Sequence, residues 1–393
     1  MDSIRTQKEI RFGSFVVYAK TVGVLEGEGE ITKEIFLNSL LSFTRNYRNV
    51  RIEVFGIPIY SKKIRTREIR RILGIPVYYC KGERSFRRYM EKNIGDSHDY
   101  ILISRHNIGE TTIYLMYISE WIRALNAKRP AILVWRQRDV EFYSMFLKEK
   151  CDMIRFDVSQ WDINFYLKKT YTRIGNSTIV CPTYDIAGKM KAMLPLQSEV
   201  NFVTMIMSSM SISHSLRYVG DLYITEKAKS YVETQIIREL ENRDFVLFCP
   251  EATTLKKMPA YFWDDLYKIF VQKGYSVVFN TTTDLKKMSN SIKRPCKMDE
   301  LYYLATRSSG IISLASGLGV LLSLSQVKCD LLYTDFNEIS GDFKSSLVKR
   351  LYSVKHLPCN EAVNDIYEWD VEDFECDELV DMISSRYPDV SSK

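Results

Sequence analysis

The segment ASGLG, residues 315–319, combines small residues with the hydroxyl of a serine. Small residues let a phosphate approach the backbone, and the free N–H groups at the start of a helix bind an anion. Gly317 and Gly319 are therefore candidate phosphate contacts; Ser316 would supply a hydroxyl, and Leu318 lies between the glycines. The alternative is that these glycines only allow a strand and a helix to pack tightly. The spacing is not G-x-G-x-x-G, so it does not support a nicotinamide cofactor.

A second segment suited to phosphate chemistry is EATTLKK, residues 251–257, which combines hydroxyls with lysines. Such side chains would neutralise a diphosphate leaving group without a metal ion. The alternative is an ordinary solvated loop. The side chains predicted to contact the phosphates here are Thr253, Thr254, Lys256 and Lys257.

The third segment is RHNIGETT, residues 105–112, which supplies the carboxylate of Glu110. A carboxylate in a cleft would accept the proton of an attacking hydroxyl group. The alternative is that Glu110 is a first-turn helix residue, favoured there by the helix dipole, and that His106 is simply exposed. The neighbours expected to contact the hydroxyl-bearing substrate are Arg105, His106, Asn107 and Thr111.

Each of these segments follows a predicted strand. Continuous apolar runs at residues 99–104, 244–250 and 310–315 are typical of parallel strands that are buried on both faces. From residue 98 onwards such strands alternate with helix-like segments, for example residues 260–273, which predicts βαβ units. The sequence therefore predicts an α/β protein with parallel sheets. Ligands of open α/β sheets bind outside the carboxyl ends of the strands.

The length of the chain predicts more than one domain, because 393 residues exceed what one core usually organises. We expect two Rossmann-like domains with parallel sheets that face each other across a cleft. The predicted boundaries are residues 1–215 for the first domain and 216–370 for the second. A C-terminal helix and tail would occupy residues 371–393.

The N-terminal third has a weaker pattern. Residues 15–20 resemble a strand, and residues 32–46 have helical spacing. Two similar phrases follow, FGIPIY at residues 55–60 and LGIPVYY at residues 73–79. Each is a Gly-Ile-Pro turn that leads into β-rich residues, which indicates a short local duplication.

Residues 308–327 contain no charged side chain, and a membrane-spanning helix needs about 20 such residues. Six serines and three glycines lie within this run. Its first part, GIISLA, has the composition of a buried strand, and its last part, GVLLSLSQV, that of a helix. We therefore expect a central strand and the helix after it; a membrane span is the alternative.

The overall composition is that of an ordinary soluble globular protein, with 46% hydrophobic and 26% charged residues. Residues 1–11 are polar and mixed in charge, so we do not expect a signal sequence there. The eight cysteines are spread singly, without a Cys-x-x-Cys pair, which suits a reducing cytoplasm. Neither they nor the four histidines have the spacing of metal ligands. No metal site and no cofactor are therefore expected.

The net charge of +6 is unevenly placed. Residues 61–92 carry eleven basic and three acidic side chains, a net charge of +8. Such a segment suits anionic lipid headgroups or phosphates; a solvated charged face is the alternative. No recognised nucleic-acid-binding module accompanies it, so no nucleic-acid partner is expected.

Residues 244–347 resemble GT-B fold glycosyltransferases of bacterial surface (capsular, exo- and lipo-) polysaccharide biosynthesis, related to the heptosyltransferases. Residues 250–280 are similar to the first strand, loop and Trp-containing helix of that family, and residues 298–335 to its second half. The segment IGET, residues 108–111, is similar to the Gly-Asp-x element that carries the catalytic carboxylate in heptosyltransferases. The resemblance covers most of the chain and is clearest in its C-terminal half.

The chain departs from the family pattern at three positions. The usual phrase is Leu-Arg-Ser-Gly-x-x-Asp, whereas residues 314–320 read LASGLGV. Ala315 and Val320 therefore replace an arginine and an aspartate, and an arginine there would grip a nucleotide diphosphate bidentately. Glu110 replaces an aspartate, which moves the carboxylate by one methylene.

The resemblance implies metal-independent transfer of a sugar from a nucleotide sugar to a hydroxyl of a surface glycan or of its lipid-linked precursor. The C-terminal domain would bind the donor, and the N-terminal domain would bind the acceptor and supply Glu110 as general base. Residues 61–92 would keep this cytoplasmic enzyme at the anionic inner membrane surface. The alternative, favoured by Ala315 and Val320, is a non-catalytic GT-B-fold partner that binds glycan or another transferase.

Overall fold

The structure is a computed structural model that spans the chain. It describes residues 3–12, 15–25, 29–36, 41–46, 49–55, 57–64, 67–73, 75–81, 87–88, 90–92, 97–103, 108–134, 137–147, 151–155, 170–182, 201–213, 222–252, 254–281, 291–293, 296–336, 344–357 and 365–390.

The chain divides into two compact units. Unit 1 consists of Met1–Ile103, Lys128–Arg136 and Met153–Tyr184. Unit 2 consists of Ser104–Ala127, Gln137–Asp152 and Asp185–Lys393. Both units contain parallel strands, so the predicted α/β class with two Rossmann-like sheets is confirmed.

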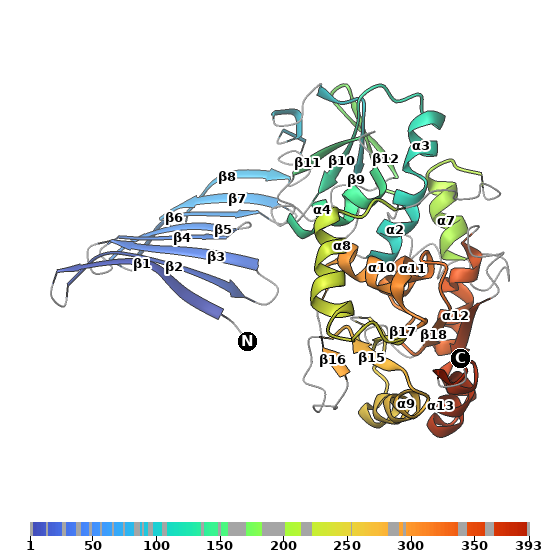
Figure 1. The fold of residues 1–393 in the computed structure, drawn as a ribbon. Coiled ribbons are helices and arrows are strands. Elements are labelled where there is room, and N and C mark those ends of the chain that lie inside the picture. Colours follow the sequence, from blue (N-terminus) through green and yellow to red (C-terminus); the bar gives the residue numbers. More distant parts are fainter. Residues whose placement is uncertain are drawn as a thin grey trace. The chain divides into compact units, whose positions relative to one another are not determined.

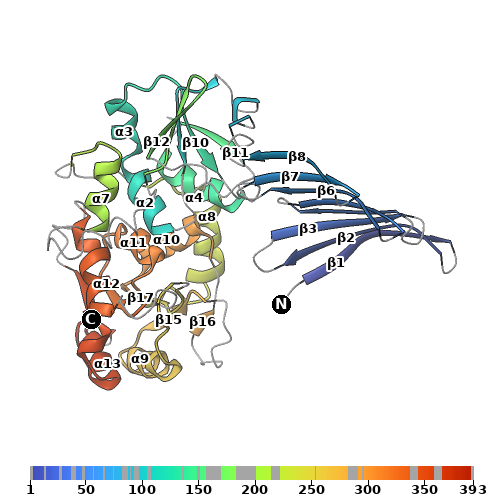
Figure 2. The ribbon, with the colours of Figure 1, turned by 180° about the vertical axis from the view of Figure 1, so that it is seen from behind.

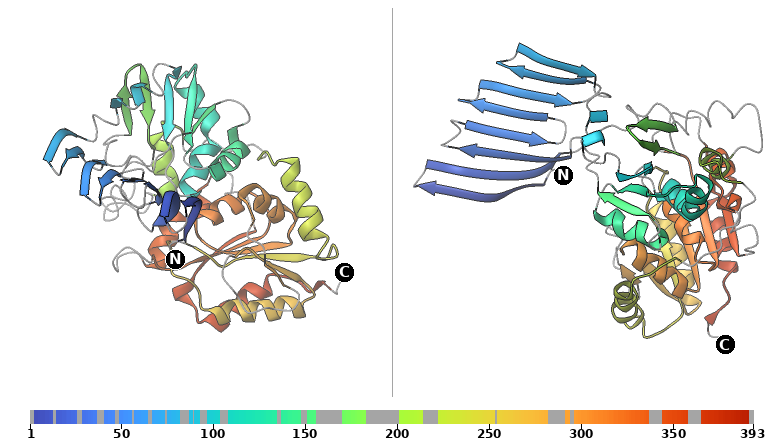
Figure 3. Two further views of the ribbon diagram at one scale, coloured as in Figure 1. Left: turned by 90° about the vertical axis from the view of Figure 1, so that its left-hand side faces the viewer. Right: turned by 90° about the horizontal axis from the view of Figure 1, so that it is seen from above.

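Unit 1 begins with an eight-stranded antiparallel meander, in which each strand pairs with the next along the chain (Figure 1; Figure 3, right panel). Its strands are β1 (Ser3–Phe12), β2 (Phe15–Leu25), β3 (Gly29–Phe36), β4 (Leu41–Asn46), β5 (Asn49–Val54), β6 (Ile57–Ile64), β7 (Arg67–Ile72) and β8 (Ile75–Lys81). The sequence pattern did not predict this sheet.

The helix expected over residues 32–46 is wrong, because this stretch contributes to β3 and β4. The strand β3 pairs along its full length with β2 and also with β4. Cross-strand pairing on both sides decides the conformation here against the local helical spacing.

The repeated phrases are two hairpin turns. Phe55 and Leu73 have positive φ angles of 51° and 48°, and each is followed by a glycine. The pairs that close the turns are Val54 with Ile57 in the first hairpin, and Ile72 with Ile75 in the second. Two-residue hairpin loops need positive φ, which accounts for the duplicated turn sequence.

The second sheet of unit 1 has the strand order β11-β10-β9-β13-β12. β9 pairs in parallel with β10 and with β13, whereas β12 and β13 form an antiparallel hairpin. The bounds are β9 (Tyr100–Ile103), β10 (Pro130–Val134), β11 (Asp152–Arg155), β12 (Tyr171–Ile174) and β13 (Ser177–Val180). The strand β9 lies where the apolar run at residues 99–104 predicted it.

Unit 2 contains a fully parallel six-stranded sheet with the order β16-β15-β14-β17-β18-β19. Figure 2 labels three of its strands, β15, β16 and β17. In chain order this is 3-2-1-4-5-6, the order of dinucleotide-binding Rossmann sheets. The bounds are β14 (Phe245–Cys249), β15 (Ser276–Phe279), β16 (Ser291–Lys293), β17 (Gly310–Leu314), β18 (Cys329–Tyr333) and β19 (Ile366–Asp370). β16 forms one edge of this sheet and β19 forms the other.

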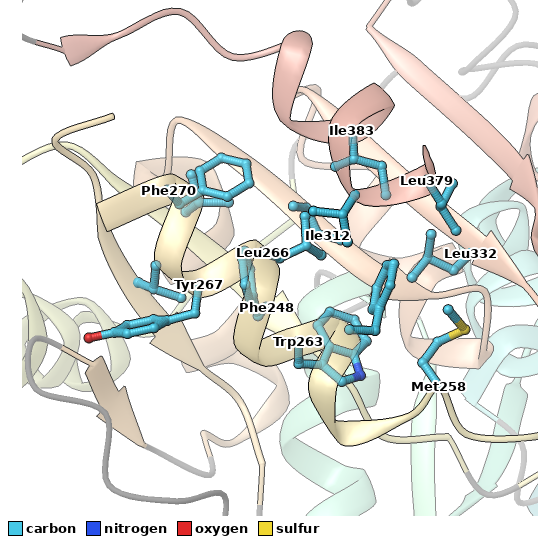
Figure 4. Close-up of a cluster of buried hydrophobic side chains, with 14 of the residues drawn as sticks. Phe248, Met258, Trp263, Leu266, Tyr267, Phe270, Ile312, Leu332, Leu379 and Ile383 are labelled. Atoms are coloured by element: carbon cyan, nitrogen blue, oxygen red, sulfur yellow. The ribbon is translucent and has the colours of Figure 1, made fainter. Parts of the chain in front are cut away.

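One face of this sheet is covered by α9 (Ala260–Gln272) and α13 (Cys376–Ser385), which pack against each other. Phe248, Trp263, Phe270, Leu332 and Ile383 belong to the apolar core between these helices and the strands (Figure 4). The predicted final helix of the chain, α13, is thus part of this layer.

The helices on the other face of the sheet are α8 (Glu226–Val232), which continues as a short π-helix (Glu233–Ile237), α10 (Met298–Arg307), α11 (Gly317–Ser323) and α12 (Ser345–Tyr352) (Figure 3, left panel). Further helices of unit 2 are α2 (Ile108–Met116), α3 (Ile118–Ala124), α4 (Gln137–Leu147) and α7 (Phe202–Ser209). Three of these form a second layer, since α2 packs on α11, α4 on α10 and α7 on α12.

The uncharged run at residues 308–327 is the strand β17 followed by the helix α11, as predicted. Every residue of β17 is buried, which explains its continuous apolar sequence. Among the helices that the structure describes, none has the length and apolar character needed to cross a bilayer.

Candidate functional site

The site is built around the neighbouring strands β14 and β17 of unit 2. They run in parallel, with Cys249 opposite Ser313. The chain continues from β14 towards β15 on one side and from β17 towards β18 on the other. This divergence marks the topological switch point of the sheet, where α/β proteins bind ligands outside the carboxyl ends of the strands.

Two of the predicted segments begin at this switch point. Residues 251–257 follow β14, and Ser316 follows β17 by two residues. The two segments are far apart in sequence, but the parallel pairing of β14 and β17 places their starting points at one edge. The sequence prediction that both lie at a carboxyl edge is therefore confirmed.

The loop after β14 reaches across to the segment after β18. Leu255 forms an isolated antiparallel bridge with Phe336. The Lys256 N–H donates to the Asp335 carbonyl at 2.7 Å, and the Thr334 hydroxyl donates to the Lys256 carbonyl at 2.7 Å. Since β17 lies between β14 and β18, this loop spans the carboxyl end of β17.

The predicted polar side chains of this loop lie at the surface. Thr254, Lys256 and Lys257 are exposed. Within the described part of the chain, neither lysine side chain forms an ion pair. Thr253 lies outside the described residues. Two exposed ammonium groups beside the end of β17 could therefore meet an anionic ligand without first breaking an ion pair.

A carboxylate that the sequence prediction did not select also lies at this edge. Glu251 accepts a hydrogen bond from the hydroxyl of Thr281. Thr281 is buried and follows β15 by two residues. The signal was present in the sequence, because each residue comes directly after a buried parallel strand.

Ser316 caps the helix α11. Its Oγ accepts a hydrogen bond from the Leu318 N–H at 3.3 Å. Ser316 has extended backbone angles, as an N-cap residue does. The hydroxyl and the first N–H groups of α11 thus occupy the position that the sequence predicted for phosphate contacts.

The two glycines of this segment lie in crowded surroundings. A Cβ atom at Gly319 would lie 3.2 Å from Leu331 Cδ2 and 3.4 Å from the Leu314 carbonyl oxygen. A Cβ atom at Gly317 would meet the Gly109 backbone nitrogen and lie 3.2 Å from the Gly109 Cα. Tight packing therefore accounts for both glycines, and their contact with phosphate stays a prediction.

The contact between Gly109 and Gly317 joins the first turns of α2 and α11. Both residues lack a side chain, so the two backbones can touch. As a result, the segment that carries Glu110 and the segment that carries Ser316 lie side by side within unit 2. Because residues 251–257 begin at the same sheet edge as Ser316, the structure brings together all three segments that sequence analysis singled out.

Glu110 is half-buried in the first turn of α2 and lies near Tyr352. Burial, and secondly the charge of Glu110, raise the pKa of the Tyr352 phenol above its ordinary value. The Tyr352 ring packs against Phe202 at 5.0 Å and against Phe336 at 5.6 Å between ring centroids. No sequence signal indicated Tyr352 or Phe336.

The remaining predicted neighbours of Glu110 differ in their surroundings. Thr111 is buried, and its hydroxyl accepts a hydrogen bond from Tyr114 at 2.9 Å. This packing position accounts for the side chain without a ligand. Arg105, His106 and Asn107 lie outside the described residues.

These elements form a continuous set. Glu110 lies beside Tyr352, Tyr352 contacts Phe336, and Phe336 pairs with Leu255 in the loop that carries Lys256 and Lys257. The arrangement places a carboxylate, two ammonium groups and the start of a helix around one edge of a parallel sheet. Chemically, it could receive a proton from a hydroxyl and stabilise a phosphate that leaves.

No protein-family model matches the chain, and no curated protein matches it. Several solved structures are similar. The E. coli ADP-heptose LPS heptosyltransferase II is 13% identical, with 73% of this chain and 98% of that chain covered and a TM-score of 0.46. The E. coli heptosyltransferase WaaC, with ADP-2-deoxy-2-fluoro heptose, is 7% identical, with 74% and 100% covered and a TM-score of 0.44.

A glycosyl transferase family 9 structure from Veillonella parvula DSM 2008 is 12% identical, with 75% of this chain and 93% of that chain covered and a TM-score of 0.44.

Proposed function

We propose that the chain is a glycosyltransferase that moves a sugar from a nucleotide-sugar donor to a hydroxyl group of a bacterial surface glycan or of its lipid-linked precursor. The observation that carries this proposal is the contact between Gly109 and Gly317. It places the carboxylate-bearing turn of α2 beside the switch point of a sheet with dinucleotide-binding strand order.

On the donor side, the diphosphate would lie at the carboxyl end of β17. The hydroxyl of Ser316, which accepts from the Leu318 N–H and can still donate its own proton, would face it together with Thr253 and Thr254. Lys256 and Lys257 would neutralise the charge that develops on the leaving nucleoside diphosphate, which is the role of a metal ion in other phosphate sites. No metal is part of this proposal.

On the acceptor side, Glu110 would act as general base. The acceptor oxygen forms a bond to the anomeric carbon, and the bond from that carbon to the phosphate oxygen breaks. The hydroxyl proton passes to the Glu110 carboxylate, and the nucleoside diphosphate leaves with the bonding electron pair. Arg105, His106 and Asn107 are the proposed neighbours of the acceptor, whereas the buried Thr111 hydroxyl already accepts a hydrogen bond from Tyr114.

We also propose that the enzyme is cytoplasmic and works at the inner face of an anionic membrane, where lipid-linked acceptors are accessible. The net charge of +8 in residues 61–92 supports this placement.

The proposal is tested by a thermal-shift screen with UDP, GDP, ADP, CMP and their sugar conjugates, using inorganic phosphate at matched ionic strength as the control. A ligand at about 100 times its Kd adds about 2.7 kcal/mol to the free energy of unfolding. We expect a clear rise in Tm with one nucleotide and none with phosphate. Absence of a shift with every nucleotide would contradict the proposal and favour a non-catalytic binding partner.

A further inference from the structure

The hairpin turns of the meander expose an unusual amount of apolar surface. Phe55 is 74% exposed, Leu73 65%, Ile57 62% and Ile72 49%. Five of the nine large hydrophobic side chains that are exposed in the described part of the chain lie on this sheet. They are Leu41, Phe55, Ile57, Ile72 and Leu73.

These residues gather at one end of the sheet. Leu41, at the start of β4, lies opposite Val54, and Val54 lies opposite Ile57 across the first turn. Ile72 lies opposite Tyr60, three residues after Ile57, so the second turn is set back along the strands by a few residues. The chain leaves β8 at Lys81, opposite Arg67, which is the other end of the meander.

An apolar row on one face of the sheet continues from these turns. Phe43 lies opposite Ile52, Ile52 opposite Tyr60, and Tyr60 opposite Ile72. Side chains of directly opposite residues share a face. Phe43, Ile52 and Tyr60 are each only half-buried, so the apolar turns and this row form one surface, which we call the hairpin-tip surface.

The strands beside this surface are strongly basic. Residues 49–81 contain eight basic and two acidic residues, a net charge of +6. The carboxylate of one of the acidic residues, Glu53, forms an ion pair with Arg51 at 2.6 Å and accepts a hydrogen bond from Ser42 at 2.8 Å.

We propose that the hairpin-tip surface docks on an anionic lipid bilayer. Phe55, Ile57 and Leu73 would enter the boundary between headgroups and acyl chains, and the basic strands would contact lipid phosphates. A second copy of the chain fits this surface poorly, because a symmetric contact would bring two surfaces of charge +6 together. This inference deepens the membrane part of the proposed function, and it rests on surface chemistry rather than on sugar transfer.

The test is flotation of the full chain with vesicles of phosphatidylcholine alone and of phosphatidylcholine with 30% phosphatidylglycerol. We expect binding to the anionic vesicles, weakened by 0.5 M salt, and no binding to the neutral ones. The double variant F55S/L73S should bind anionic vesicles at least about tenfold more weakly than the parent, because both anchors lose their apolar groups. The control is Tyr223→Ser, which removes an exposed aromatic side chain from unit 2 and should bind as the parent does.

A second variant reports insertion directly. In Phe55→Trp, the added tryptophan should shift its emission to shorter wavelength with anionic vesicles and be quenched by brominated acyl chains, relative to the parent protein. Equal vesicle binding by the parent and by F55S/L73S, or no emission change in Phe55→Trp, overturns the proposal. Self-association that F55S/L73S abolishes, without vesicle binding by the parent, also overturns it and identifies a second copy as the occupant.

The outcome is independent of the proposed transfer reaction. F55S/L73S should keep the nucleotide-induced thermal shift, because no residue of the site in unit 2 changes. A parent protein that binds vesicles but no nucleotide would contradict the proposed function and leave the docking surface intact. A parent protein that binds nucleotide but no vesicle would contradict the docking surface and leave the proposed function intact.

Discussion

Gly109 and Gly317 touch through their backbones, because a Cβ atom on residue 317 would lie 3.2 Å from the Gly109 Cα and would also meet the Gly109 nitrogen. This contact fixes the start of α2 against the start of α11. It therefore sets where Glu110 lies relative to Ser316 and the end of β17. The geometry of the proposed site depends on two residues that have no side chain.

Gly317→Ala should destabilise the protein by about 1–3 kcal/mol, because the added methyl meets backbone atoms that cannot move aside independently. Urea unfolding measures this change. The control is Gly319→Ala, whose methyl would meet the end of the Leu331 side chain and should cost less. Equal effects of the two substitutions would show that the contact between α2 and α11 is not tight.

Glu110→Gln should reduce kcat about 10²- to 10⁴-fold and leave the nucleotide Kd unchanged, because the amide cannot accept the acceptor proton. Steady-state kinetics and nucleotide titration measure the two quantities. Glu120→Gln, a matched change in the first turn of α3, should leave both unchanged. Full turnover by Glu110→Gln would show that another group is the base.

Lys256→Gln and Lys257→Gln should each weaken nucleotide binding, because each removes a positive charge that faces the phosphates. The loss should be only about three- to tenfold, since both side chains are exposed and solvent screens their charges. Isothermal titration at low and high salt would also show a smaller salt dependence in the variants. Lys227→Gln, an exposed lysine of α8, is the control. Unchanged affinity in both variants would remove the loop from the donor site.

The free energy of unfolding should fall as the pH rises above about 10. Burial, and secondly the charge of Glu110, raise the pKa of folded Tyr352, whereas the unfolded phenol ionises near its ordinary value. The unfolded state therefore binds fewer protons above this pH, and stability is lost as the pH rises towards the folded pKa. Tyr352→Phe should reduce the slope, which urea unfolding at several pH values would measure. An unchanged slope would show that Tyr352 ionises alike in both states.

Local sequence patterns determined much of unit 2. Parallel strands such as β14 and β17 are buried on both faces, so their continuous apolar runs predict them. The amphipathic helix α9 follows β14 where the sequence pattern predicted a helix. The same logic placed residues 251–257 and Ser316 at strand ends. It also showed that the uncharged run at residues 308–327 holds a strand and a helix.

The meander could not be predicted in this way. Residues 32–46 have helical spacing, and only pairing with neighbouring strands makes them β3 and β4. The duplicated turns at Phe55 and Leu73 were visible in the sequence as phrases. Whether these phrases form hairpin turns depends on the cross-strand register, which local sequence does not specify.

The contacts that build the site were decided by tertiary structure alone. The order of the strands brings the ends of β14 and β17 together, and two glycines far apart in sequence let α2 approach α11. Tyr352 lies near enough to Glu110 to feel its charge only because helices from separate parts of the chain pack together. Residue types and strand ends are local properties that a sequence displays, whereas proximity between distant segments arises when the whole chain packs.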